Sequence, residues 1–350
     1  MIVYQDQQFG FYEIFNEQNG TLVRSDDING NEPAMRSFPE LLDVGVMGHC
    51  ESGTACAIAG IDCYQRGRDR NSAHMTFADF SEIVRQCAGK TFQFALGGAG
   101  DPNKHPAFGE MLKLCRQYAI VPNITTSGSN LTDSEIGFIE KYCGAVAVSW
   151  YSRLVDGEEY NPKTIETIDR LIDRGCSTNI HFVVSADTIK EATVRLQENI
   201  FPPGINAVIF ILYKPVGNGK IEKMLSLKDP RLDVFMDAVQ NISHPFRIGF
   251  DTCFTPLLVQ KIGHMAEQSI DACEAATFSM YIDSALNCYP CSFGIELGVS
   301  ESMRNRSLRE IWNGDLFSDF RNRQKIKCTG CNKKYLCRYG CMLALPIDLC

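Results

Sequence analysis

The stretch that decides the fold runs from residue 41 to residue 64 and reads LLDVGVMGHCESGTACAIAGIDCY. It begins with an apolar run, Leu41–Met47, that is typical of a buried strand. Three cysteines follow, the last beside a tyrosine: Cys50, Cys56, Cys63 and Tyr64. In a parallel α/β barrel, the loop after a strand opens onto the carboxyl-terminal face, where active sites gather. Three thiolates there can hold a four-iron cluster by three of its irons, which leaves the fourth iron free to bind a small molecule.

Short apolar runs alternate with helical segments from about residue 41 to residue 214, which indicates repeated βα units around a parallel sheet. The predicted strands are Leu41–Met47, Phe92–Leu96, Ile120–Thr125, Ala145–Ser149, Asn179–Val184 and Ala207–Tyr213. Thr132 and Glu135 have capping-box spacing at the start of one helix, and Gly175 supplies a stop after another. We therefore expect an α/β fold, a partial (βα)6 TIM-like barrel with a carboxyl-terminal cysteine-rich iron–sulfur domain.

The carboxyl-terminal end is dense in cysteine, with the spacing C-x2-C-x5-C-x3-C and one more cysteine nine residues on. The members are Cys328, Cys331, Cys337, Cys341 and Cys350, with Cys273 and Cys291 upstream. Free thiols at this density are an oxidation liability, whereas iron–sulfur clusters use four cysteines each and hold their loops together. Structural zinc prefers two C-x2–4-C or C/H knuckles, and this end has one clean knuckle, so the spacing favours iron–sulfur clusters.

Composition indicates a large protein in a reducing compartment. The chain has 350 residues, 45% of them hydrophobic, which is enough for one long domain and a smaller one. Its 16 cysteines are too few per residue for a disulfide scaffold, so we expect reduced thiols and a cytoplasmic location. No signal peptide or membrane span is expected from the sequence. A net charge of −8 without a long basic run argues against nucleic acid as the main partner.

We expect four segments along the chain. Residues 1–40 form an N-terminal strand pair with polar turns, and residues 41–225 form the partial barrel. The pattern weakens in residues 226–252, which we interpret as a bridge, and residues 253–350 form the cysteine-rich domain.

The order of these motifs resembles the radical SAM superfamily, which uses S-adenosylmethionine (SAM). In that family the first strand is followed by C-x3-C-x2-C-aromatic, the second by a GGEP-like motif and the third by a TNG-like motif. The matching residues here are Cys63-Tyr64, Gly98-Ala99-Gly100-Asp101-Pro102 and Thr125-Thr126-Ser127-Gly128, with Ser149 ending the fourth strand. The cysteine spacing is C-x5-C-x6-C, and Asp101 and Ser127 replace Glu and Asn. A longer loop can still place three thiolates around a cubane, and Asp101 keeps a carboxylate for the SAM ammonium group.

This resemblance implies two sets of site residues. A SAM-binding [4Fe-4S] cluster would be held by Cys50, Cys56 and Cys63. SAM itself would be bound by Tyr64, Gly98, Gly100, Asp101, Thr126, Ser127 and Ser149.

The carboxyl-terminal end resembles the SPASM subgroup, which carries auxiliary clusters. The subgroup pattern is matched except that Leu286 stands in the place of a glycine, and Ser307–Asn313 looks like the short helix between the two cluster loops. By this likeness an outer [4Fe-4S] cluster would be held by Cys328, Cys331, Cys337 and Cys350, and an inner one by Cys273, Cys291 and Cys341. For the fourth inner ligand Cys253 is preferred, because it follows a predicted strand, Phe246–Phe250. Cys288 and a position open to substrate are the alternatives.

SPASM relatives mostly modify peptides and proteins. The resemblance therefore implies an enzyme that cleaves SAM reductively and abstracts a hydrogen atom from a peptide or protein, giving oxidation or cross-linking, with flavodoxin or ferredoxin as electron donor. A sulfatase-modifying enzyme is less favoured, because that group usually has Asp after the cysteine corresponding to Cys291 and this chain has Ser292. The alternatives are a dehydrogenase that acts on a small molecule or forms a cofactor, an iron–sulfur electron carrier and a zinc-stabilised binding protein.

Other cysteines and histidines have a structural interpretation. Core packing is the favoured role of Cys87, Cys115, Cys143 and Cys176. Loop or core positions are favoured for His49, His105 and His181. An alternative interpretation is that the three cysteines after the first strand are unrelated buried thiols: Cys50, Cys56 and Cys63. The sequence identifies neither the catalytic residues nor the substrate.

Overall fold

The computed structural model describes residues 1–51, 56, 60–155, 158–160, 163–262, 270–323 and 328–341. Within these residues the largest sheet has the strand order β12-β11-β10-β7-β6-β5-β4-β13-β14-β15. Its six central members are β4 (Leu41–Met47), β5 (Gln93–Gly98), β6 (Val121–Thr126), β7 (Val146–Ser149), β10 (Thr178–Val184) and β11 (Ala207–Leu212). Neighbouring central strands are all parallel. The predicted partial (βα)6 barrel is confirmed, with each strand within two residues of its predicted bounds.

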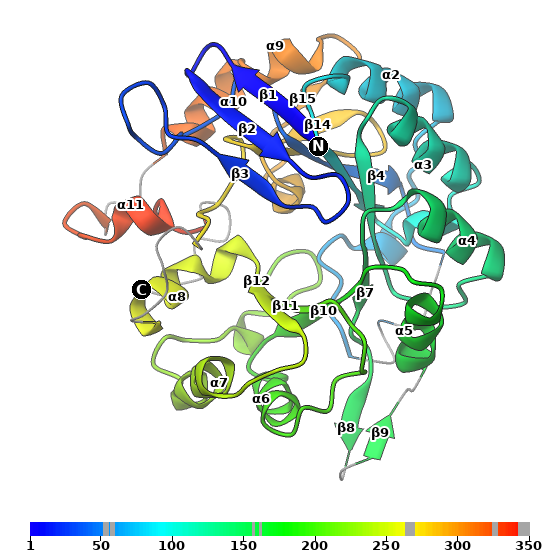
Figure 1. Ribbon diagram of the computed structural model, residues 1–350, viewed down its shortest axis with the longest axis vertical. Coiled ribbons are helices and arrows are strands. Elements are labelled where there is room, and N and C mark those ends of the chain that lie inside the picture. Colours follow the sequence, from blue (N-terminus) through cyan, green and yellow to red (C-terminus); the bar gives the residue numbers. More distant parts are fainter. Residues whose placement is uncertain are drawn as a thin grey trace.

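Helices follow the outer side of this sheet, as Figure 1 shows. They are α2 (Phe77–Cys87), α3 (Phe108–Gln117), α4 (Asp133–Tyr142), α5 (Lys163–Asp173), α6 (Ile189–Gln197) and α7 (Pro230–Asn241). Each carries an apolar face into the core; that of α3 consists of Phe108, Met111, Leu112 and Cys115. The predicted capping box is present at α4, because Thr132 and Glu135 bond each other's backbone N–H groups. A short hairpin, β8 (Arg153–Val155) and β9 (Glu158–Tyr160), lies between β7 and α5 in the chain.

The segment interpreted as a bridge is part of the barrel. Residues 226–252 contain α7 and a further strand, β12 (Arg247–Phe250), which pairs in parallel with β11. This strand lies within the strand predicted at Phe246–Phe250, which is therefore confirmed. The sheet therefore extends one strand beyond the six predicted for the barrel, and this strand belongs to the sheet and not to a bridge.

The N-terminal segment has one strand more than the predicted pair. β1 (Ile2–Asp6), β2 (Phe11–Phe15) and β3 (Leu22–Arg24) form a separate antiparallel sheet. The third strand has three residues, which is too short for alternation to mark it in the sequence.

The cysteine-rich segment continues the barrel sheet at its other edge. β13 (Ser279–Ile282) pairs in parallel with β4, and β14 (Asn287–Tyr289) and β15 (Glu301–Ser302) follow as antiparallel strands. The helices of this segment are α8 (Thr255–Lys261), α9 (Leu308–Trp312), α10 (Asp315–Arg321) and α11 (Lys334–Cys337). The predicted short helix is α9, which begins at a capping box of Ser307 and Glu310. Because β13 and β4 share a ladder, the cysteine-rich segment and the barrel form one continuous sheet.

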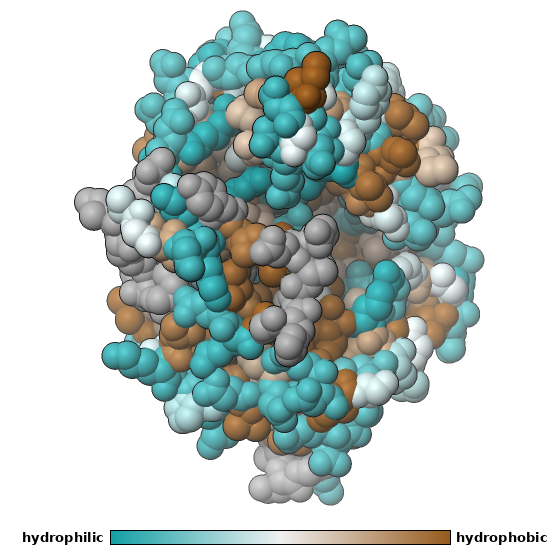
Figure 2. Space-filling model, turned by 60° about the vertical axis from the view of Figure 1, so that its left-hand side comes forward, coloured by the Kyte–Doolittle hydropathy of each residue, from teal (hydrophilic) through white to brown (hydrophobic). Residues whose placement is uncertain are grey.

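Polar and apolar residues are unevenly spread over the surface. On the face drawn in Figure 2, apolar residues gather toward the hollowed middle, inside a largely hydrophilic rim. No helix in the described part of the chain combines the length and the apolar character needed to cross a membrane.

Candidate cofactor cavity and cysteine sites

A cavity of about 460 Å³ lies at the carboxyl ends of the central strands. Its wall is formed by the loops that follow β4, β5 and β6, and it is completed by residues at the ends of β7, β10 and β11. All ten residues predicted for the SAM site line it: Cys50, Cys56, Cys63, Tyr64, Gly98, Gly100, Asp101, Thr126, Ser127 and Ser149. The structure therefore brings the three motif loops to one cavity of a size typical for a small-molecule cofactor.

Three thiols meet at one side of this cavity. Cys56 Sγ lies 3.4 Å from the Tyr151 hydroxyl, and Cys63 Sγ accepts a hydrogen bond from the Gly67 N–H at 3.4 Å. The Cys50 N–H donates to the Gly67 carbonyl at 2.9 Å, which ties the Cys50 and Cys63 loops together. Burial raises the pKa of the Cys56 thiol, and the neighbouring Cys63 and Cys50 raise it further. Thiols that hinder one another's ionisation are a donor set suited to a cationic metal centre, so these residues fit a cluster.

Gly98 and Gly100 have a steric role. Gly98 has φ +117°, and a Cβ there would lie 2.7 Å from the Met47 carbonyl oxygen. A Cβ on Gly100 would lie 2.8 Å from the His49 carbonyl oxygen. The glycines thus let the loop after β5 pack directly against the loop that carries Cys50.

Asp101 joins the ends of the second and third strands. Its carboxylate accepts the Ser127 N–H at 2.7 Å and also the Ser127 hydroxyl. The neighbouring Thr126 hydroxyl donates to Asn103 Oδ1 at 3.0 Å. These bonds fix the carboxylate in the cavity wall.

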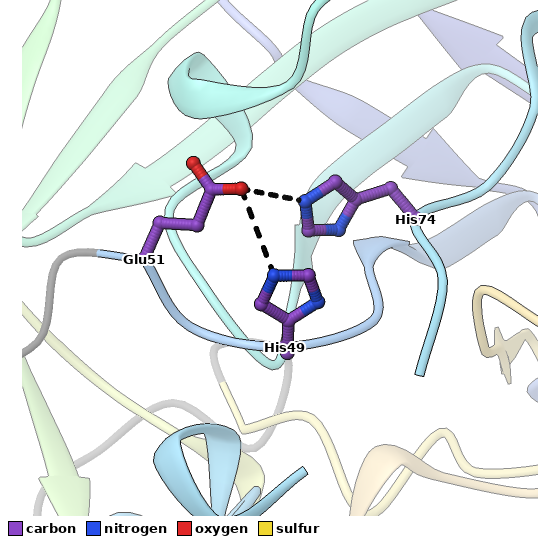
Figure 3. Close-up of side chains that lie close together, drawn as sticks. All are labelled: His49, Glu51 and His74. Atoms are coloured by element: carbon purple, nitrogen blue, oxygen red, sulfur yellow. Dashed lines mark hydrogen bonds and ion pairs between the residues drawn. The ribbon is translucent and has the colours of Figure 1, made fainter. Parts of the chain in front are cut away.

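His49, Glu51 and His74 form a cluster beside Cys50 (Figure 3), with ligand atoms within 4.8 Å of one another. His74 Nδ1 accepts the Gly48 N–H at 3.1 Å, so in the neutral ring Nε2 carries the proton and donates to Glu51 at 3.1 Å. His49 Nδ1 lies 2.8 Å from the Ser72 carbonyl oxygen. His74 therefore has no ring nitrogen free to bind a metal. The contacts of the cluster hold His49 and Glu51, the two residues that flank Cys50.

Several polar residues of the cavity were missed by the motif analysis: Asp43, Tyr151, His181, Lys214 and Asp251. Burial raises the pKa of Asp43 to about 7. Burial lowers the pKa of His181 to about 4, against an opposing effect of Asp251. A positional signal existed for Tyr151, Lys214 and Asp251, because each stands just beyond the carboxyl end of a central or edge strand.

Cys341 lies near three cysteines from distant parts of the chain: Cys253, Cys273 and Cys291. The thiols of Cys253 and Cys341 are hydrogen-bonded, and this contact together with burial raises the pKa of Cys253 well above its usual range. Burial raises the pKa of Cys273 to about 11 and that of Cys291 to about 12, and the charge of Cys341 contributes to both. A set of four thiols grouped around Cys341 fits a four-iron cluster. We call these four residues the inner site.

Cys288 lies elsewhere. It is fully buried in β14, and the charged or ionisable groups near it include Asp283, Cys87 and Glu301. Its neighbour Leu286, which stands in the place of a glycine, has φ +69°. The left-handed backbone that glycine favours is therefore kept without glycine.

Three of the four cysteines predicted for the outer cluster lie in the described part of the chain. Cys328 and Cys337 are buried and Cys331 is exposed. The Cys331 N–H donates to the Cys328 carbonyl at 3.1 Å, and Cys337 ends α11. Cys350, predicted as the fourth ligand, lies outside the described residues.

The remaining sequence predictions for cysteines and histidines concern the core. Cys87 and Cys115 are fully buried in the main core, and Cys143 and Cys176 pack against it. His105 is buried, with Nε2 2.8 Å from the Met75 carbonyl oxygen. His181 lies in β10 and lines the cavity.

Comparisons with known proteins agree with this geometry. Residues 273–332 match the model of the SPASM family, an iron–sulfur cluster-binding domain. The fold is similar to that of SuiB from Streptococcus suis bound to the precursor peptide SuiA, with 18% identity and a TM-score of 0.69, over 90% of this chain and 74% of SuiB. It is also similar to anSMEcpe with bound AdoMet, with 17% identity and a TM-score of 0.60, over 87% of this chain and 89% of anSMEcpe. A search of curated proteins found no match.

Proposed function

This chain carries a SPASM domain on a radical SAM partial-barrel fold, and from that premise we propose that it is an enzyme that cleaves SAM reductively and removes a hydrogen atom from a peptide or protein. The observation that carries the proposal is the meeting of three thiols, the glycine-rich loop and Ser127 on one cavity at the carboxyl ends of parallel strands. When bound, a four-iron cluster and SAM supply a 5′-deoxyadenosyl radical that abstracts hydrogen.

The residues of the cavity have separate roles in this proposal. Cys50, Cys56 and Cys63 hold the cluster. Asp101, fixed by Ser127, presents a carboxylate to the SAM ammonium group. The wall around them is mostly apolar and excludes water from a reactive radical.

The inner site supports oxidation or cross-linking as the outcome. A substrate radical that becomes an oxidised product must lose one electron and a proton. Phe293 lines the cavity two residues after Cys291, so the inner site lies next to the space where the substrate would react. An external donor such as flavodoxin or ferredoxin would supply the electron that starts each turnover.

A peptide is favoured over a small molecule as the substrate. SuiB was solved with a precursor peptide bound, and anSMEcpe was solved with AdoMet and the Cp18Cys peptide. The cavity also favours an enzyme over an electron carrier, because electron transfer alone needs no internal space of about 460 Å³. Oxygen-sensitive clusters and 16 cysteines are consistent with a reducing compartment such as the cytoplasm.

The test is anaerobic incubation of reconstituted protein with SAM, dithionite and candidate precursor peptides. We expect 5′-deoxyadenosine, and for the matching peptide a mass lowered by two hydrogen atoms for each oxidation or cross-link. Absence of 5′-deoxyadenosine from protein loaded with iron would contradict the enzyme assignment. Production of 5′-deoxyadenosine that responds to small molecules and to no peptide would favour the dehydrogenase alternative.

A further inference from the structure

Lys214 is a buried cation at the end of β11, in the wall of the cavity. Its Nζ lies 2.7 Å from Asp251 Oδ2 and 3.1 Å from the Leu212 carbonyl oxygen. The ammonium group also lies 4.4 Å from the centroid of the Phe293 ring, in a cation–π contact. Neither the cavity motifs nor the cysteine pattern accounts for a charged side chain at this place.

Two of the residues that contact Lys214 are close in sequence to cysteines of the inner site. Asp251 stands two residues before Cys253, and Phe293 stands two residues after Cys291. Asp251 is held in turn, because its Oδ1 accepts the Leu212 N–H at 3.1 Å. One ammonium group therefore connects the barrel to two of the loops that carry inner cysteines.

The segment that follows Lys214 is also joined to the loop of the SAM-binding cysteines. The Asn218 N–H donates to the Cys63 carbonyl at 3.0 Å, and Arg66 Nη2 donates to the Gly217 carbonyl at 3.1 Å. The rings of Tyr64 and Phe293 lie 4.9 Å apart between the two regions. Lys214 thus lies in the wall between the two cysteine sites, on the side of the inner one.

We propose that Lys214 is a positioning residue whose charge raises the reduction potential of the cluster at the inner site. The inference rests on the proposed function, because it needs a cluster there. A cubane bound by four thiolates is an anion, and reduction adds one more negative charge. A cation buried close to it stabilises the reduced form, since charges interact more strongly in a low-dielectric interior than in water.

The charge is kept despite the burial of the side chain. Burial alone lowers the pKa of a lysine, but Asp251, Cys253 and Cys341 oppose this effect, and the pKa of Lys214 is raised overall. Asp251 offsets part of the cation's effect on the inner site. Changes at the two residues should therefore move the reduction potential in opposite directions.

The experiment is an EPR-monitored redox titration of anaerobically reconstituted protein, with iron content measured for each variant. Lys214→Met should move the midpoint potential of the inner cluster to a more negative value, and Asp251→Asn should move it to a more positive one. Lys214→Arg keeps the charge and should stay near wild type. Lys223→Met is the matched control, because Lys223 also lines the cavity but pairs with Asp62, at 2.8 Å. Its inner potential should equal that of wild type.

The outcomes separate this inference from the proposed function. Loss of inner iron in Lys214→Met but not in Lys214→Arg also supports a role for the charge. Unchanged potentials in both Lys214→Met and Asp251→Asn with full iron would overturn the inference, and so would equal loss of inner iron in Lys214→Met and Lys214→Arg. A wild-type protein without an inner cluster would instead contradict the part of the proposed function in which the inner site accepts an electron, before any variant is compared.

Discussion

The two cysteine sites of this protein are built in different ways. Cys50, Cys56 and Cys63 come from one stretch of chain and face a cavity of about 460 Å³. The inner site takes its cysteines from positions between residue 253 and residue 341, and it has a buried lysine and its carboxylate partner beside it. Three thiols beside an open space leave room for a ligand on the metal. Four thiols close the coordination of a cubane, which suits electron transfer.

The largest expected effect comes from removing the open site. Changing Cys50, Cys56 and Cys63 together to Ala should remove about four irons and abolish reductive SAM cleavage. The inner site shares none of these residues, so its signal should persist. Iron analysis, EPR and 5′-deoxyadenosine production are the measurements. Unchanged 5′-deoxyadenosine production in this variant would remove the basis for the SAM-binding assignment.

A change at Cys253 separates the two candidates for the fourth inner ligand. Cys253→Ala should lower iron by about four and remove the inner signal while the SAM-responsive signal remains. Cys288→Ala is the matched control, because Cys288 is also a cysteine of this domain but lies near Cys87. It should keep full iron. The reverse result would assign the ligand to Cys288, and full iron in both variants would leave the position open to substrate.

Gly217 tests the link between the two regions. It has φ +64°, and a Cβ there would lie 2.3 Å from the Tyr64 carbonyl oxygen and 2.6 Å from that of Cys63. Gly20 has φ +73° with no atom within 4 Å of the added Cβ, so Gly20→Ala isolates the backbone strain. We expect Gly20→Ala to cost about 1 kcal/mol of unfolding free energy and Gly217→Ala about 1–3 kcal/mol more.

The same pair should differ in cofactor binding. Gly217→Ala pushes on the loop of Cys63 and should weaken SAM binding, whereas Gly20→Ala should leave it unchanged. Denaturation and SAM titration check both effects. Equal stability and equal SAM affinity in the two variants would show that residues 214–219 do not support the open site.

The smallest effect is expected at Asp101. Asp101→Asn keeps an oxygen that can accept the Ser127 N–H but removes the negative charge proposed to face the SAM ammonium group. Hydrogen bonds to charged groups contribute about 1.5–3 kcal/mol, so SAM affinity should fall about 10-fold or more. Iron content should stay at the wild-type value. Equal SAM affinity in the variant and the wild type would show that the Asp101 carboxylate only joins the ends of β5 and β6 and does not bind SAM.

Local patterns made most of the barrel predictable. Leu41–Met47 is apolar apart from Asp43, and Ala207–Leu212 is a continuous apolar run; such runs mark buried parallel strands. The pairing of β13 with β4 was not predictable, because Ser279 and Leu41 lie far apart in the chain and no local pattern records their contact. The strand at Phe246–Phe250 was predicted, but its place in the barrel sheet was not, because that place depends on pairing with β11.

The sites were predictable to a similar degree. The residues predicted from the motifs line the cavity, because the spacing of cysteine and glycine reflects local backbone geometry. The role of Lys214 was not visible, since it depends on Asp251 and Phe293, which reach it from other elements. At Leu286 the sequence pattern changed while the backbone conformation did not. A leucine in the place of a glycine suggested a departure from the pattern, yet the chain keeps the left-handed conformation.

The most direct test of the difference between the two sites is EPR of the dithionite-reduced protein with and without SAM. Our account predicts that SAM perturbs one cluster signal, which is absent from the Cys50, Cys56 and Cys63 triple variant. The signal that disappears in Cys253→Ala should be the same with and without SAM. If SAM leaves every signal unchanged, or perturbs the signal that Cys253→Ala removes, the assignment of an open and a closed site is contradicted.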